Sequence, residues 1–325
     1  MSKVITSPAT NIPLHEKSHV RGWSLTWADR LNAEINERCT ESIMQYERVY
    51  LDHGVNWSGA LNLFSGADDS VFERFNRLLA VGAGKVTSLD WEMPDYGAFL
   101  AKRLNAASTS KQITAEWCEA VSRFCKEVEH IKFDSIDHSW LSWGDSHTPA
   151  FAPNGHKNAV LKKDGRTLYG VLKERMLDDI EVKPDVKGVT ICLGSIDVRH
   201  HLCRPESADL DKLLQEYRNQ AVRFRDRIGV TVELCAPVPV EFESRKIPKT
   251  GYFKNTPFFG TREERLNKTV QIMSTIKSWD FPLVAPPSLR YTMDGEDYAK
   301  QYMELGGSVH TAPPFYRRNS EWVTL

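Results

Sequence analysis

The sequence predicts a three-layer α/β/α fold, in which helices cover both faces of a mainly parallel β-sheet. Segments with helical periodicity alternate with short apolar runs of strand length, and this alternation is typical of parallel sheets. The 325 residues exceed a typical single domain of roughly 100–150 residues. With 41% hydrophobic and 26% charged residues, the chain has the composition of a globular protein that folds unaided. We therefore expect one large α/β domain or a core with a substantial extension.

The predicted helices have apolar residues at spacings of three and four, which place one apolar stripe against a core. They cover residues 24–46, 71–79, 113–128, 207–227 and 262–279. The predicted strands are apolar runs that end in Gly, Pro, Asp or Asn, the residues of turns. They cover residues 48–51, 86–89, 139–143, 189–193, 231–236 and 283–285. Because ligands collect at the carboxyl ends of parallel strands, we expect functional residues directly after each run.

Charge and cysteine usage exclude several classes of protein. The 42 Lys and Arg residues against 43 Asp and Glu argue against a broad basic surface for nucleic acid. The six cysteines lack CxxC spacing and indicate reduced thiols.

The start of the sequence is polar, and no stretch approaches the roughly 18 apolar residues of a membrane span. We expect a cytoplasmic protein with no membrane contact. No nucleotide-binding glycine motif follows a strand, and no cofactor is expected.

The segment 139–147 indicates a strand that runs into a Gly-Asp-Ser turn. Ser146 in such a turn is a candidate nucleophile, since free backbone N–H groups nearby could stabilise a developing oxyanion. Asp145 and His147 flank it and are candidate substrate-binding residues. The alternative is that Gly-Asp-Ser is ordinary turn composition.

A second polar segment, 194–201, follows the apolar strand at 189–193. Together, the two segments resemble the SGNH/GDSL hydrolases, and most closely a subgroup whose third block is Gly-Glu-Ile-Asp-x-Arg-x-His. The matching residues are Gly194, Ile196, Asp197, Arg199 and His201, with Ser195 in place of the Glu. The resemblance covers roughly residues 131–325 and implies an SGNH, flavodoxin-like core. Residues 1–130 would form an N-terminal α/β extension, with a possible role in substrate recognition.

The resemblance implies roles for individual residues. Ser146 would be the nucleophile and His310 its general base. The Ser146 N–H would form part of the oxyanion hole with Gly170, the glycine of the second block, and Gly194 would open the third. Two positions depart from the family: Ile196 replaces the oxyanion-hole Asn, and Gly307 replaces the Asp expected three residues before the histidine.

Charged residues within the third block are candidate substitutes for the missing groups. Asp197, Arg199 and His201 could orient a base, or Arg199 could bind an anionic substrate through two hydrogen bonds. The alternative is a structural ion pair between Asp197 and Arg199. His200, His201 and Cys203 could also ligate a metal, but adjacent residues on an extended segment point to opposite sides. We expect no metal.

The N-terminal region has polar strand ends of its own. Asp52, Asn56 and Trp57 follow one predicted strand, and Trp91 follows the next one. Aromatic rings with carboxylate and amide groups suit a sugar, a nucleoside or a nucleobase. The alternative is a loop whose aromatic residues cap the core.

The stretch from Lys246 to Arg265 is both basic and aromatic. It is the best candidate for contact with a phosphate-bearing or nucleic-acid partner. A lid over the strand ends is an equally good interpretation.

The preferred hypothesis is an SGNH-like hydrolase or acyl transferase that acts on an ester or acyl group through Ser146 and His310, with Asp197 as a third catalytic residue. One alternative is a transferase that modifies a nucleotide, nucleic acid or sugar without a covalent serine intermediate, through Asp52, Asn56, Asp197 and Arg199. Another is a non-catalytic binding module.

Overall fold

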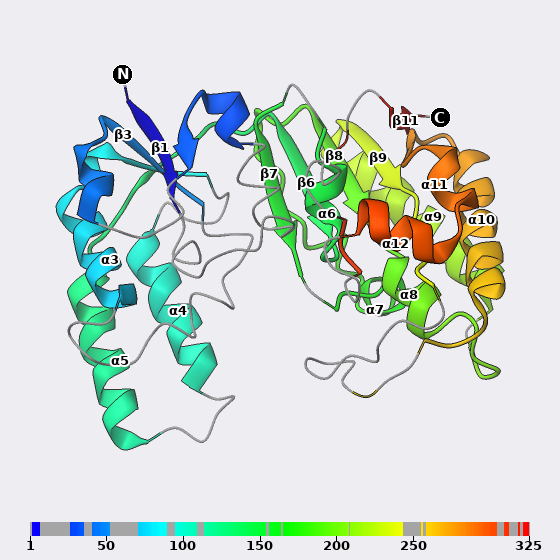
Figure 1. Cartoon of the computed structure of the whole chain (residues 1–325), viewed down its shortest axis with the longest axis horizontal. Coiled ribbons are helices and arrows are strands. Elements are labelled where there is room, and N and C mark those ends of the chain that lie inside the picture. Colours follow the sequence, from blue (N-terminus) through cyan, green and yellow to red (C-terminus); the bar gives the residue numbers. More distant parts are fainter. Residues whose placement is uncertain are drawn as a thin grey trace. The chain divides into compact units, whose positions relative to one another are not determined.

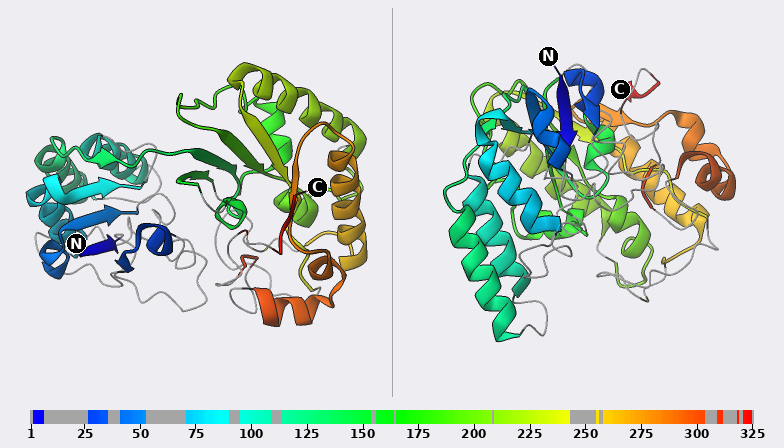
Figure 2. Two further views of the ribbon diagram at one scale, coloured as in Figure 1. Left: turned by 90° about the horizontal axis from the view of Figure 1, so that it is seen from above. Right: turned by 60° about the vertical axis from the view of Figure 1, so that its left-hand side comes forward.

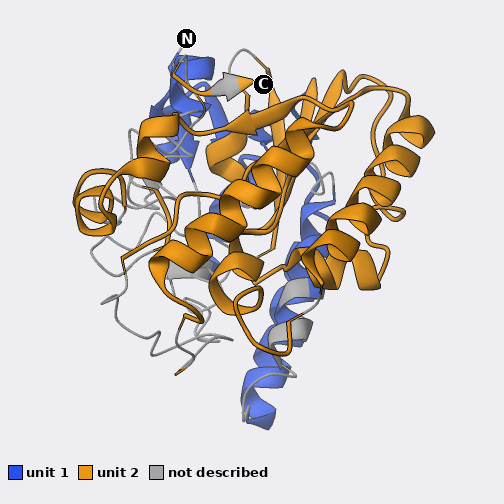
Figure 3. Ribbon diagram, turned by 90° about the vertical axis from the view of Figure 1, so that its right-hand side faces the viewer, with its two compact units in different colours: residues 1–16, 23–137 blue, residues 17–22, 138–325 orange. Residues whose placement is uncertain are grey.

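The structure is a computed structural model, and it describes most of the chain. The described residues are 2–6, 27–35, 41–52, 71–89, 95–108, 114–153, 156–163, 165–207, 209–242, 255, 258–303, 309–311, 318 and 321–324. They fall into two compact units, which meet in sequence between Asp137 and His138 (Figure 3). Each unit has its own sheet, and the two are described separately below.

The first unit contains a five-stranded parallel sheet with the order β2-β1-β3-β4-β5. Figure 1 labels β1 and β3 of this sheet. Its strands are β1 (Lys3–Thr6), β2 (Glu34–Ile35), β3 (Arg48–Leu51), β4 (Val86–Ser88) and β5 (Asp134–Ser135). Its helices are α3 (Val71–Val81), α4 (Tyr96–Ser108) and α5 (Ala115–Val128), with short 3₁₀ turns η2 (Glu41–Gln45) and η3 (Ala83–Lys85).

The core of the first unit lies between its sheet and α3, α4 and α5. Val4 and Val49 are paired in register on neighbouring strands and are fully buried. On α5, Val121, Phe124 and Val128 follow at spacings of three and four and form its buried face. Since β5 and the buried residues just before it complete this sheet and core, the first unit extends past residue 130, where the sequence placed the boundary.

The second unit contains a six-stranded sheet with the order β11-β10-β9-β8-β6-β7. Its strands are β6 (Trp140–Gly144), β7 (Asn158–Lys162), β8 (Gly188–Cys192), β9 (Thr231–Cys235), β10 (Leu283–Ala285) and β11 (Val323–Thr324). All neighbours are parallel except β11, which is antiparallel to β10. If the five parallel strands are numbered along the chain, their order is 2-1-3-4-5, which is the flavodoxin-like order.

Helices cover both faces of this second sheet. They are α6 (Thr148–Phe151), α7 (Leu168–Lys173), α8 (Ser195–His200), α9 (Leu210–Ile228), α10 (Arg262–Lys277), α11 (Ser288–Thr292) and α12 (Gly295–Tyr302). The connection β6–α6–β7 runs along the sheet in the direction opposite to β8–α9–β9–α10–β10. Because such crossovers are right-handed, α6 lies on one face and α9 and α10 on the other (Figure 2). The predicted three-layer α/β/α fold is confirmed, and an N-terminal α/β unit accompanies the core.

One predicted helix is wrong as a continuous element. In its described part, the segment 24–46 is helical over residues 27–31 and then contains the strand β2 and the 3₁₀ turn η2. Tyr46, one of its apolar positions, donates a hydrogen bond from its hydroxyl to Glu34 at 2.8 Å. No helix among the described residues is long and apolar enough to cross a membrane.

Candidate functional site

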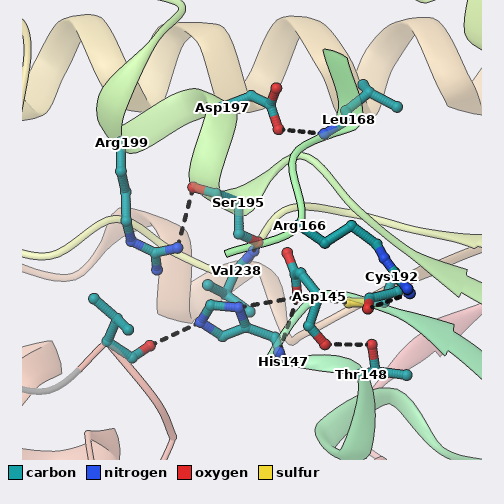
Figure 4. Close-up of polar contacts among 12 residues, drawn as sticks. Asp145, His147, Thr148, Arg166, Leu168, Cys192, Ser195, Asp197, Arg199 and Val238 are labelled. Atoms are coloured by element: carbon teal, nitrogen blue, oxygen red, sulfur yellow. Dashed lines mark hydrogen bonds and ion pairs between the residues drawn. The ribbon is translucent and has the colours of Figure 1, made fainter. Parts of the chain in front are cut away.

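The candidate site lies at the carboxyl end of β6, which lies between β8 and the edge strand β7 in the second unit's sheet. From β6 the chain passes through α6 to β7, which lies on one side of β6. The strands β8, β9 and β10 are added on the other side of β6. Such a reversal of strand order is where parallel sheets bind their ligands. The segments that follow β6 and β8 supply most of the residues singled out from the sequence (Figure 4).

Gly144 allows β6 and β8 to approach closely at this end. It pairs with Cys192 across the sheet and has a φ of +153°. A Cβ atom at Gly144 would lie 1.9 Å from the Cys192 carbonyl oxygen, so no side chain fits there. The turn that carries Asp145, Ser146 and His147 therefore starts from a fixed backbone position.

Asp145 and His147 form a buried pair within this turn. The Asp145 side chain is fully buried, and its Oδ1 lies 2.8 Å from the His147 backbone nitrogen and 3.2 Å from Nδ1 of the His147 ring. The Asp145 backbone N–H donates to the Cys192 carbonyl, and its own carbonyl accepts from Thr148 Oγ1 at 2.6 Å. These contacts, most of which Figure 4 shows, hold the turn to both β8 and α6.

The other ring nitrogen of His147 reaches a distant segment of the chain. Nε2 lies 3.0 Å from the Val309 carbonyl oxygen, which only accepts hydrogen bonds. The ring of the next residue, His310, packs against the His147 ring, with centroids 5.2 Å apart. The structure therefore brings His310 to the turn that carries Ser146.

Ser146 itself is 6% exposed. It makes no hydrogen bond with His310 or with any other described residue. Within the described part of the chain, both its hydroxyl and its backbone N–H are thus uncommitted.

The glycines and the isoleucine named from the resemblance have clear local roles. Gly194 has a φ of +98° and is the N-cap of α8, a conformation that favours glycine. Gly170 lies in α7, and its N–H donates to Thr167 Oγ1, the N-cap of that helix, at 3.0 Å. This N–H is committed to the cap, which does not match the oxyanion role that the resemblance implies. Ile196 is buried at 7% exposure.

Asp197 holds the start of α7. Its Oδ2 accepts from the Leu168 N–H at 2.7 Å and its Oδ1 from the Tyr169 N–H at 3.1 Å. Burial raises the pKa of the Asp197 carboxyl to about 6, although these N–H groups favour the charged form. These contacts give Asp197 a structural role in joining α8 to α7.

Arg199 does not pair with Asp197. Its guanidinium forms a buried ion pair with Glu241, and it also donates to the Ser195 carbonyl at 3.1 Å. Of the two interpretations of Arg199, the structural ion pair matches its contacts, with Glu241 as the partner. An arginine committed in this way has a reduced capacity to bind an anionic substrate.

The neighbouring histidines show no metal arrangement. His201 is half-buried, and desolvation followed by the nearby Arg204 charge lowers its pKa. The His200 ring packs against Phe258, with centroids 5.3 Å apart. Among the described residues, no group of three His, Cys, Asp or Glu side chains is placed to hold a metal ion.

The N-terminal candidates belong to the first unit. Asp52 follows β3, is 4% exposed, and donates from its backbone N–H to the Thr6 carbonyl at 2.9 Å. Asn56 lies outside the described residues.

The basic-aromatic stretch is described only at its C-terminal end, and Lys246, Lys249 and Lys254 lie outside the described residues. Arg265 is 1% exposed and donates to the carbonyls of Gly260 and Glu241. Arg265 is therefore an internal anchor of α10, and an anionic partner at the rest of this stretch stays a prediction.

Four further residues in this region have contacts that the sequence does not predict. Glu241 is the partner of Arg199, and nothing in its local sequence pattern indicates this pairing. Cys192 and Cys235 end neighbouring strands, and burial raises the pKa of both thiols. Val309 takes part only through its carbonyl oxygen, which no sequence pattern identifies.

No protein-family model matches the chain, and no curated protein matches its sequence. Among solved structures, a protein from Streptococcus pneumonia described as a platelet activating factor is 14% identical and has a TM-score of 0.41, over 67% of this chain and 94% of the other. The acetyl xylan esterase AlAXEase is 16% identical with a TM-score of 0.31, over 44% of this chain and 75% of its own. Est24, a carbohydrate acetylesterase from Sinorhizobium meliloti, is 12% identical with a TM-score of 0.33, over 55% of this chain and 93% of its own.

Proposed function

We propose that the protein is an SGNH-like serine hydrolase or acyl transferase that acts on an ester or related acyl group. The observation that carries this proposal is the convergence of two segments at the end of β6. The Gly144–His147 turn presents Ser146, and the His310 ring packs against that same turn. A nucleophile beside a candidate base, at the point where the strand order reverses, is the minimum that acyl transfer requires.

In the proposed reaction, Ser146 Oγ attacks the acyl carbon and its proton passes to His310. The tetrahedral intermediate then collapses, the bond to the leaving alcohol breaks, and His310 returns the proton to that alcohol. Water or another acceptor next attacks the acyl-enzyme and gives its proton to His310. The bond between the acyl carbon and Ser146 Oγ then breaks, and His310 returns the proton to Ser146 Oγ. The nature of this second acceptor is what separates a hydrolase from an acyl transferase.

The oxyanion hole in this proposal differs from the one that the sequence resemblance implies. Ile196 has no donor, and the Gly170 N–H is bonded to Thr167. The Ser146 N–H, which has no acceptor among the described residues, is the donor that the proposal uses. Because loss of one such donor typically lowers the rate about 10²–10³-fold, we expect modest turnover unless the substrate supplies further contacts.

The test is hydrolysis of short-chain p-nitrophenyl esters by the purified protein. Ser146→Ala should lower kcat at least about 10³-fold and abolish labelling by a fluorophosphonate, because the attacking oxygen is gone. Ser274→Ala, at an exposed position on α10, is the matched control and should leave both unchanged. Labelling or hydrolysis that survives Ser146→Ala rules out the nucleophile, and would favour a binding module or a transferase without a serine intermediate.

A further inference from the structure

The segment that carries His310 is fixed on both sides of this residue. On one side, the Val309 carbonyl lies 3.0 Å from His147 Nε2. On the other side, Thr311 forms an isolated antiparallel bridge with Met303, which is 3% exposed and directly follows α12. His310 is the residue between these two anchors.

The anchor at Val309 depends on Asp145. The Val309 carbonyl only accepts, so His147 Nε2 must carry a proton and donate it. Nδ1 faces Asp145 Oδ1 at 3.2 Å, and the same oxygen accepts the His147 backbone N–H at 2.8 Å. With the Asp145 side chain fully buried and His147 at 1% exposure, solvent does not compete for these bonds. The ring therefore has one orientation, and that orientation sets the position of Val309.

We propose that His147, held by Asp145, is the positioning residue for His310. It acts through Val309 and through the packing of the two imidazole rings, whose centroids are 5.2 Å apart. In catalytic triads a third group orients the base. Here residue 307, where the resemblance expects that acid, is a glycine. The Asp145–His147 pair, which contacts the segment of His310, can orient the base instead. The inference rests on the function proposed above, since it requires His310 to be the base.

The test uses two variants that differ in one contact. His147→Gln retains an amide N–H at about the reach of Nε2, whereas His147→Asn is too short to reach Val309. We expect His147→Asn to lower kcat about 10- to 100-fold at nearly unchanged KM, because a small misplacement of the base slows chemistry more than binding. His147→Gln should lose less than about fivefold. His130→Gln, at an exposed position in the first unit, is the control and should have wild-type kinetics.

A double-mutant cycle with His310→Ala separates positioning from a general structural role. If His147 acts through His310, His147→Asn should cause little further loss of rate once His310 is absent. Equal losses in both backgrounds overturn the proposal, as do equal kcat values for the Asn and Gln variants or a change confined to KM.

A measurement on the intact wild-type protein covers the case in which His147→Asn does not fold. Nitrogen-15 spectra of the histidine rings, with His147 assigned through His147→Gln, should show a protonated Nε2. An unprotonated Nε2 contradicts the bond to Val309 and overturns the proposal. Failure of the underlying function has a different signature, because Ser146→Ala would then retain wild-type activity.

Discussion

At the residue scale, the candidate site consists of buried polar groups whose partners differ from those that the sequence suggested. Arg199 and Asp197 are two positions apart, yet one pairs with Glu241 and the other caps α7. The types of residue at the strand ends were predictable, because turns after strands are polar. The pairings were not, since Glu241 lies 42 residues from Arg199 and Val309 lies 162 residues from His147.

Asp197 makes the stability of the fold depend on pH. Its carboxyl has a pKa of about 6 in the folded chain against 3.8 as the ordinary value. Between these values the folded chain holds a proton that the unfolded chain has lost, so the free energy of unfolding falls as pH rises from about 4 to 6. The total fall in the free energy of unfolding is on the order of 3 kcal/mol. Denaturant unfolding at several pH values should show this fall in wild type and a flatter profile in Asp197→Asn. The same dependence of unfolding on pH in wild type and in Asp197→Asn would contradict this role of Asp197.

At the scale of the elements, long periodic segments and buried strands were predictable, and short ones were not. The strands β3 and β10 have the bounds that the sequence indicates, and α5 and α9 cover the expected helical stretches. The sequence does not predict β7, which lies at the edge of its sheet, β2, which has only two residues, or β1, a buried strand of four residues. Such strands are fixed by pairing with a neighbour, because their own apolar pattern is too short to specify them.

The close approach of β6 and β8 makes Gly144 sensitive to substitution. In Gly144→Ala, the new Cβ would meet the Cys192 carbonyl at 1.9 Å, so the strands must separate or the turn must move. We expect a loss of about 2 kcal/mol or more in the free energy of unfolding, together with reduced esterase activity. Gly84→Ala is the control, since a Cβ there meets no atom within 4 Å. Equal unfolding midpoints for the two variants would contradict the steric account.

At the scale of the whole molecule, the position of the boundary is testable with fragments. A fragment ending at Asp137 retains β5 and the buried Ile131 and Phe133, whereas one ending at residue 130 loses all three. Burying each of these two side chains is worth about 1.5–3 kcal/mol. Thermal unfolding followed by circular dichroism should therefore show a cooperative transition for the longer fragment and a weaker or absent one for the shorter. Equal transitions would place the boundary at residue 130.

The two sheets share one strand order, and this has a consequence for synthesis on the ribosome. In both, the first strand lies between the second and the third, so the centre of each sheet closes only when its third strand is available. All five strands of the first sheet precede Trp140, where the second begins. Domains generally fold as units during translation, and all five strands of the first sheet are available well before β8, the third strand of the second sheet, is made. The order of synthesis thus limits the insertion of a strand of one sheet into the other, although the parallel strands of both sheets have the same order.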